Sequence, residues 1–153
     1  MSTYTATIHW SRDGAEGFAK GQYSRAHTWE FDGGLTVPAS PSPHIVPAPW
    51  NDPNGVDPEE AFVASLSSCH MLFFVDFARR AGFVVDSYVD EPEGLLDKRD
   101  DGKMAMTRVT LRPRVEFSGA NPPTAEELAE LHHRAHDACF IANSVTTEVV
   151  VEH

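Results

Sequence analysis

The sequence predicts an α+β fold in a single domain that spans residues 1–153. Extended runs cluster near both ends and in the middle of the chain, and they do not alternate with helices. Two segments between them repeat apolar residues at helical spacing behind capping signals. Clustered strands favour mainly antiparallel sheets, and 153 residues are enough to bury one core.

The N-terminal third predicts a small antiparallel sheet. Residues 4–10 alternate apolar and polar side chains, and residues 22–31 form a second, aromatic-rich run. An Asp-Gly-Gly turn at residues 32–34 leads into a third run at residues 35–37. Seven prolines over residues 38–58 then predict a loop, because proline lacks the amide donor that a sheet requires.

A long helix is predicted to begin after Asp57. Asp57 is the N-cap, with Pro58 as the first helical residue and Glu60 as its capping-box partner. Gly82 marks the end of the helix. Apolar side chains lie on nearly all of its faces, which is typical of a central, buried helix.

The second half predicts strands at residues 83–90, 94–98, 104–117 and 145–152, and a helix between Thr124 and Asn143. Pro113 forbids one ladder bond, so we expect a bulge or an edge position within residues 104–117. Thr124 and Glu127 form a second capping box.

The charge balance excludes two classes of partner. The net charge is −11, and the longest basic cluster is the pair Arg79-Arg80, so nucleic acid and anionic membranes are repelled. No segment approaches the roughly 18 apolar residues of a membrane span, and residues 1–10 do not resemble a signal peptide. We therefore expect a cytoplasmic protein.

Cys69 and Cys139 are the only cysteines of the chain. In a reducing compartment such a pair serves for packing, metal binding or redox chemistry. Each cysteine lies on or beside the buried face of a predicted helix, so the two thiols can meet, and a disulfide forms if their Cα atoms come within about 7 Å.

Ser67 and Ser68 predict a break in the first helix just before Cys69, because serine is a mediocre helix former. A break there places Cys69 at the N-terminus of a new helical segment. The positive end of the helix dipole favours a reactive thiolate at such a position.

A metal site is the competing interpretation. His132, His136 and Cys139 share one face of the second predicted helix, and Cys69 and His70 can supply further ligands. Only half of the usual zinc-ligand spacing is present, and a solvated helix face explains the histidines equally well. We therefore predict no metal and no other bound cofactor.

The residues around both cysteines resemble the OsmC/Ohr family of thiol-dependent peroxide reductases. Residues 57–70 resemble the segment that carries the first family cysteine, with Glu59 ten residues before Cys69. Residues 135–144 resemble the segment of the second cysteine, and residues 4–10 resemble the first family strand. Phe140 departs from the pattern, because the better-known branches have proline there.

The resemblance implies an OsmC-like fold in which antiparallel sheets wrap two central helices in an intertwined homodimer. It implies that Cys69 is the peroxidatic thiol and Cys139 the resolving thiol. It also implies that Glu59 holds an activating arginine, for which Arg25 is favoured over Arg12.

The expected activity is reduction of organic hydroperoxides, reset by an external dithiol or lipoyl-type reductant. Apolar neighbours of Cys69, such as Phe73, suit an organic peroxide better than hydrogen peroxide. Two alternatives remain, namely the metal site and a non-enzymatic protein of the same fold that binds a small molecule and merely packs its cysteines.

Overall fold

The computed structural model describes residues 1–153 as two compact units, Met1–Ala61 and Phe62–His153. The first unit holds a three-stranded sheet, and the second holds two further sheets and most of the helical structure. Helices combined with mainly antiparallel strands confirm the predicted α+β class.

The first unit contains β1 (Ala6–His9), the short 3-10 helix η1 (Phe18–Lys20), β2 (His27–Phe31) and β3 (Thr36–Ala39). The strands pair antiparallel in the order β1-β2-β3, so that Trp29 lies opposite both Ile8 and Val37. This arrangement confirms the predicted N-terminal sheet and its turn at residues 32–34.

The proline-rich segment is a loop, as predicted, and its end returns to β3. Val56 forms a parallel bridge with Ala39, and its amide donates to the carbonyl of Pro38 at 2.9 Å. Gly55 makes this approach possible, because a Cβ atom there would lie 2.9 Å from the carbonyl carbon of Ala39.

Helix α1 (Pro58–Arg80) begins with the predicted capping box. The amide of Glu60 donates to Asp57 Oδ1 at 2.7 Å, and the amide of Asp57 donates to Glu60 Oε2 at 3.2 Å. The helix ends before Gly82, which has the left-handed φ of 88° that favours glycine.

The predicted break at Ser67-Ser68 is wrong, because α1 is helical without interruption from Pro58 to Arg80. The serine hydroxyls find other partners. Ser65 donates to the carbonyl of Phe62 at 2.8 Å, and Ser67 donates to the carboxylate of Asp90 at 2.5 Å. Cys69 therefore lies in the middle of a helix and not at a helix N-terminus.

The second unit contains β4 (Val84–Val89), β5 (Glu93–Lys98), β6 (Met104–Leu111), β7 (Arg114–Ser118), α2 (Ala125–Ala138), the 3-10 helix η2 (Ala142–Ser144) and β8 (Glu148–Val151). β4 pairs antiparallel with β7, and β5 pairs antiparallel with β6. β8 joins the other edge of β6 in parallel.

The single strand predicted over residues 104–117 is wrong, because this stretch forms β6 and β7 in different sheets. Pro113 lies at the division, where the missing amide ends the ladder. The predicted irregularity is confirmed within β6, where the register against β5 shifts between Leu95 and Leu96.

Helix α2 begins with the predicted capping box, in which the amide of Glu127 donates to Thr124 Oγ1 at 3.2 Å. It ends at Ala138, five residues earlier than Asn143, so that prediction is wrong. Cys139 has an extended backbone with ψ 111° and joins α2 to η2. The Asn143 side chain donates back to the carbonyl of Asp137 at 2.9 Å, which satisfies one of the last carbonyls of α2.

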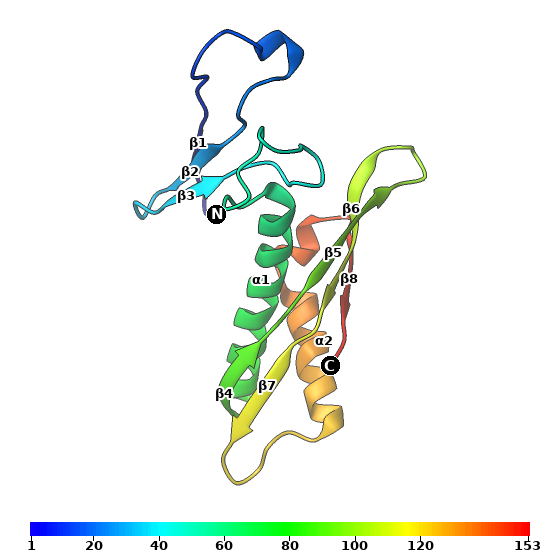
Figure 1. Ribbon diagram of the computed structural model, residues 1–153. Coiled ribbons are helices and arrows are strands. Elements are labelled where there is room, and N and C mark those ends of the chain that lie inside the picture. The colour runs from blue at the N-terminus through cyan, green and yellow to red at the C-terminus, as the bar shows by residue number, and fades with distance from the viewer. The chain divides into compact units, whose positions relative to one another are not determined.

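Figure 1 shows α1 and α2 side by side, with the strands of the second unit crossing one face of the pair. One core cluster joins Phe74 and Ala78 of α1 to Leu131 and Ala135 of α2. A second cluster packs Leu66 of α1 against two buried residues of β6, Val109 and Leu111. The two cysteine-bearing segments therefore belong to one packed unit.

Helix α1 is long and apolar enough to cross a membrane by length and composition, contrary to the expectation from sequence. Leu66, His70, Phe74 and Ala78 form one buried stripe, but only 22% of the apolar window is buried, so the predicted burial of nearly all faces of this helix does not occur within the chain. One helix of this kind is weak evidence for a membrane span, because the core helix of a soluble protein passes the same length and composition test.

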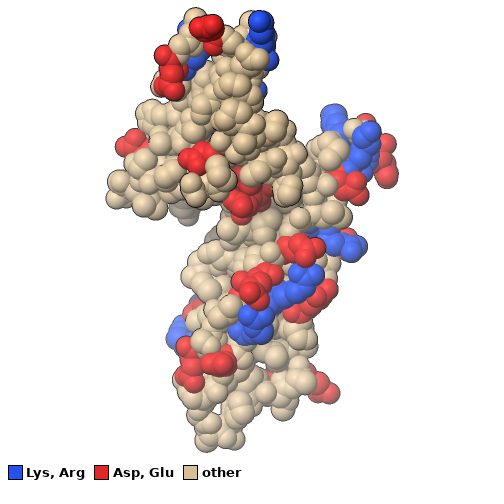
Figure 2. Space-filling model, in the orientation of Figure 1, with Lys and Arg blue, Asp and Glu red and all other residues tan.

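Acidic and basic side chains interleave over the face of the second unit that Figure 2 shows. The arginines of the β6–β7 region pair with glutamates in Arg108–Glu148 (2.9 Å), Arg112–Glu152 (3.0 Å), Arg112–Glu93 (3.6 Å) and Arg114–Glu91 (2.8 Å). Exposed pairs of this kind contribute about 0–1 kcal/mol each. The arginines of these strands therefore present neutralised charge to solvent.

Candidate active site

The structure brings the thiols of Cys69 and Cys139 together, although 70 residues separate them in the chain. Both are free cysteines, and Cys69 lies close enough to Cys139 to raise the pKa of the Cys139 thiol. The predicted meeting of the two thiols is therefore confirmed. They reach each other because α1 supplies Cys69 and the end of α2 supplies Cys139.

The two thiols differ in their access to solvent. Cys139 is only 1% exposed, whereas Cys69 is half-buried. Burial raises the pKa of the Cys139 thiol to about 11, and the neighbouring Cys69 raises it further. The amide of Ala142 donates to the Cys139 sulfur at 3.4 Å, and this amide and that of Ile141 oppose the rise in pKa. Cys139 is therefore a neutral thiol in the reduced protein.

Two phenylalanine rings connect the same two segments. Phe73 lies one turn after Cys69 on α1, and Phe140 directly follows Cys139. Their rings pack edge to face, with centroids 5.0 Å apart and an interplanar angle of 87°. Phe140 remains 70% exposed, so a large apolar surface lies beside the thiol pair.

Both cysteines lie within the part of the chain that a family model matches. That model is described as OsmC-like protein and matches residues 51–153. The chain belongs to the OsmC-like family.

Solved structures of OsmC-like proteins share the fold. An OsmC-like protein of unknown function from Vibrio cholerae is 55% identical, with a TM-score of 0.97 over 99% of each chain. The organic hydroperoxide resistance protein OsmC from Legionella pneumophila is 16% identical, with a TM-score of 0.63 over 99% of this chain and 96% of that chain.

The organic hydroperoxide resistance protein OhrB of Bacillus subtilis is 23% identical, with a TM-score of 0.60 over 97% of each chain. At such identities these two likenesses establish the fold and not the reaction. A search of curated protein sequences finds no match.

Glu59 and Arg25, which the sequence placed in the site, both lie in the first unit. Glu59 is half-buried in the first turn of α1 and forms no ion pair. The guanidinium of Arg25 lies 3.9 Å from the ring centroid of Tyr23 and donates to the carbonyls of Gly21 (3.1 Å) and Tyr23 (2.8 Å). Their activating roles in this OsmC-like chain stay predictions.

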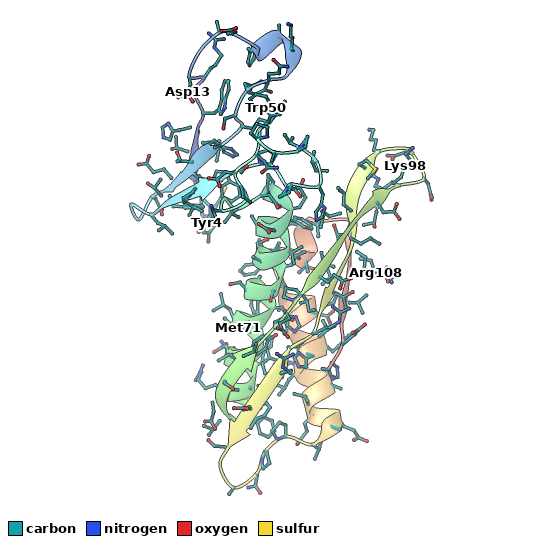
Figure 3. All side chains as sticks on the ribbon, in the orientation of Figure 1. Tyr4, Asp13, Trp50, Met71, Lys98 and Arg108 are labelled. Atoms are coloured by element: carbon teal, nitrogen blue, oxygen red, sulfur yellow. The ribbon has the colours of Figure 1, made fainter.

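Arg12, the other arginine considered, lines a hollow of about 1000 Å³ within the first unit. Asp13 and Trp50, labelled in Figure 3, line the same hollow. The guanidinium of Arg12 lies 5.4 Å from the ring centroid of Phe18. Both candidate arginines are thus held against aromatic rings, where a planar cation packs well.

The proposed metal set does not assemble. No three side chains among the histidines, cysteines, aspartates and glutamates are placed to hold a metal ion. The sequence also placed His132 on a solvated face, and this is wrong, because His132 is 2% exposed. Its neighbour His133 is the residue that faces solvent.

Sequence reasoning missed a buried histidine pair between the two helices. His70 of α1 and His132 of α2 share a hydrogen bond of 3.0 Å between Nε2 and Nδ1, and their rings stack at an interplanar angle of 7°. Burial lowers the pKa of His70 to about 4 and that of His132 to about 3. Histidine recurs on both helices in the sequence, but nothing there shows that residues 62 positions apart meet.

Proposed function

We propose that this chain reduces organic hydroperoxides with Cys69 as the peroxidatic thiol and Cys139 as the resolving thiol. The observation that carries the proposal is that a half-buried thiol lies beside a fully buried one, close enough to raise the pKa of the buried thiol. A lone packed cysteine needs no partner thiol, whereas a two-cysteine cycle requires one within reach.

In the first step the Cys69 thiolate attacks the distal oxygen of the peroxide. The O–O bond breaks, the alkoxide takes up a proton and leaves as an alcohol, and Cys69 becomes a sulfenic acid. Cys69 suits this role because it is the more accessible of the two thiols. The exposed ring of Phe140 and the ring of Phe73 favour a substrate with an apolar organic group.

In the second step the Cys139 sulfur attacks the sulfenic sulfur of Cys69. An S–S bond forms, the S–O bond breaks, and the hydroxyl group leaves as water after taking the thiol proton. The adjacency of the thiols makes this step intramolecular, which protects Cys69 from further oxidation. An external dithiol or lipoyl-type reductant then restores both thiols.

An arginine is needed to hold Cys69 as a thiolate, because the uninterrupted α1 provides no helix terminus beside it. We assign this role to Arg25, with Glu59 as the residue that positions it. A guanidinium also presents planar donors that can orient the two peroxide oxygens.

We further propose that the protein is an intertwined cytoplasmic homodimer. Large apolar side chains are exposed on the sheet and loop of the first unit, namely Ile8, Trp10, Phe18, Phe31 and Leu35. Ile8, Trp10 and Phe18 line one shallow hollow, and exposed apolar side chains gathered in this way are typical of an interface.

Thiol titration after addition of cumene hydroperoxide tests the proposed cycle. We expect one equivalent of peroxide to remove two titratable thiols per chain and to leave both cysteines in a single disulfide. Dithiothreitol should return both thiols. If no thiol is lost, the cysteines merely pack and the non-enzymatic alternative holds.

Two variants separate the roles of the cysteines. Cys69→Ser should abolish peroxide consumption, because it removes the attacking thiol. Cys139→Ser should still consume one equivalent of peroxide but should not form the intrachain disulfide. Equal peroxide consumption by both variants and the wild type would contradict the proposal.

A further inference from the structure

The surroundings of Cys139 bear on the reductive half of the cycle, which the proposed function leaves open. An intrachain disulfide offers two sulfurs to an incoming thiolate, and the product depends on which sulfur is attacked. Attack requires an approach to one sulfur from the side opposite to the bond that breaks. Access therefore has to be compared at Cys69 and at Cys139.

Cys139 is enclosed. The residue is 1% exposed, and its sulfur accepts a hydrogen bond from the amide of Ala142 at 3.4 Å. Its backbone is also held, because the Cys139 amide donates to the carbonyl of His136 at 3.2 Å and its carbonyl accepts from the amide of Asn143 at 3.0 Å. With only 1% of the residue exposed, an external thiol has no open approach to this sulfur.

Cys69 presents the opposite situation, because it lies in mid-helix with part of its surface open to solvent. We infer that the reductant attacks the Cys69 sulfur of the disulfide and that Cys139 is the leaving group. This inference rests on the proposed two-cysteine cycle. The same opening at Cys69 then admits the peroxide and the reductant in turn.

A dithiol reduces the disulfide in two exchange steps. A thiolate of the reductant bonds to Cys69, the Cys69–Cys139 bond breaks, and its electron pair leaves with Cys139, which takes up a proton. The second thiol of the reductant then attacks the mixed disulfide and releases Cys69. The reductant becomes a cyclic disulfide, and both protein thiols are restored.

The amide of Ala142 assists the departure of Cys139, because it donates to the sulfur on which negative charge develops. Burial acts against this departure, since a thiol of high pKa is the slower leaving group. The structure therefore favours exchange at Cys69, although this exchange is slow, because the reductant cannot reach the Cys139 sulfur.

Mapping of the mixed disulfide tests the inference. The full chain is first oxidised with diamide, which forms the disulfide without peroxide, and is then mixed with the monothiol N-acetylcysteine. Released thiols are trapped with N-ethylmaleimide, and peptides are identified by mass spectrometry. We expect N-acetylcysteine on Cys69 and maleimide on Cys139, at least about tenfold more abundant than the reverse pattern.

An equal or greater amount of N-acetylcysteine on Cys139 would overturn the inference, as would failure of diamide to form the disulfide. Cys69→Ser and Cys139→Ser, treated identically, show how much adduct arises without exchange. If diamide forms the disulfide and the adduct maps to Cys69 but peroxide removes no thiol, the inference stands and the peroxidase proposal alone fails.

Discussion

At Cys139, burial and hydrogen bonding act on the thiol in opposite directions. Burial raises the pKa of this thiol from 9.0 to about 11, although the amide of Ala142 donates to the sulfur. A rise of about two pKa units lowers the thiolate fraction at neutral pH by about a hundredfold. The resolving thiol is thus kept from reacting with external oxidants while its partner is open to them.

We expect the two thiols to alkylate at different rates. Iodoacetamide at neutral pH should label Cys69 first and Cys139 at least about tenfold more slowly, because alkylation needs an accessible thiolate. Time-resolved mass spectrometry of the two cysteine peptides measures both rates. Cys69→Ser should lose the fast phase alone, and similar rates at both sites would contradict the assigned burial.

Phe140 is expected to select the organic group of the peroxide. Phe140→Ala removes an exposed ring beside the thiol pair, so kcat/KM for cumene hydroperoxide should fall by up to about tenfold, as expected for one aromatic contact. The value for hydrogen peroxide should stay within about twofold, because that substrate has no apolar group.

Leu72→Ala is the matched control for Phe140→Ala. Leu72 is 63% exposed on the cysteine-bearing helix but takes no part in the ring pair. Steady-state kinetics with both peroxides should show no change in this variant. Equal losses for both peroxides in Phe140→Ala would mean that the ring acts on the thiols and not on the substrate.

At the scale of elements, the join between β3 and the end of the proline-rich loop depends on Gly55. Gly55→Ala should destabilise the first unit by about 1–3 kcal/mol, because its new Cβ would lie 2.9 Å from backbone and side-chain atoms of Ala39 and Ser40. Urea unfolding followed by tryptophan fluorescence measures this, since all three tryptophans lie in the first unit.

Gly33→Ala provides the control for Gly55→Ala. Gly33 lies in the β2–β3 turn, where an added Cβ meets nothing within 4 Å and the residue does not have a positive φ. Its unfolding midpoint should stay close to that of the wild type. If Gly55→Ala also has an unfolding midpoint close to that of the wild type, the loop backbone moves to accommodate the added Cβ and the prediction is wrong.

Elements with local signals were predicted from sequence, and elements fixed by distant contacts were not. The capping partners of Asp57 and Thr124 lie only three residues further along the chain, so the starts of both helices could be predicted. The end of α2 depends instead on how Cys139 turns toward α1, and no local signal marks that turn.

The same distinction holds for the candidate site. The position of each cysteine on or beside the apolar face of a predicted helix indicated that the two thiols can meet. The burial of His132 could not be predicted, because its polar ring is accepted in the core only through a hydrogen bond to His70, 62 residues away. The helix break predicted from the serines before Cys69 failed for a related reason. The Ser67 hydroxyl donates a hydrogen bond to Asp90 on a neighbouring segment, and the helix stays intact.

At the scale of the whole molecule, the buried histidine pair links stability to pH. His70 and His132 titrate near 4 and 3 in the folded chain, but near 6.5 once unfolded. The unfolded chain therefore binds more protons below pH 6.5, and stability falls with decreasing pH. Each histidine lowers the free energy of unfolding by up to about 1.4 kcal/mol for each pH unit between its unfolded and its folded pKa value.

We expect the free energy of unfolding of the second unit to fall between pH 6.5 and pH 4. Far-UV circular dichroism follows this unit, because it holds most of the helical structure. His132→Phe should make the fall shallower by removing one titrating ring, whereas His44→Gln, at an exposed position, should not. An unchanged pH dependence in His132→Phe would contradict the linkage.

The parallel pairing of β8 with β6 has a consequence for the order of folding. Arg108 lies opposite Glu148 in this ladder, 40 residues further along the chain, and both helix α2 and strand β7 come between them. During synthesis β6 emerges with one edge open and stays so until β8 follows. A nascent chain stalled before residue 148 would present that edge to other strands, which makes the β5–β6 hairpin the point at which misassembly should start.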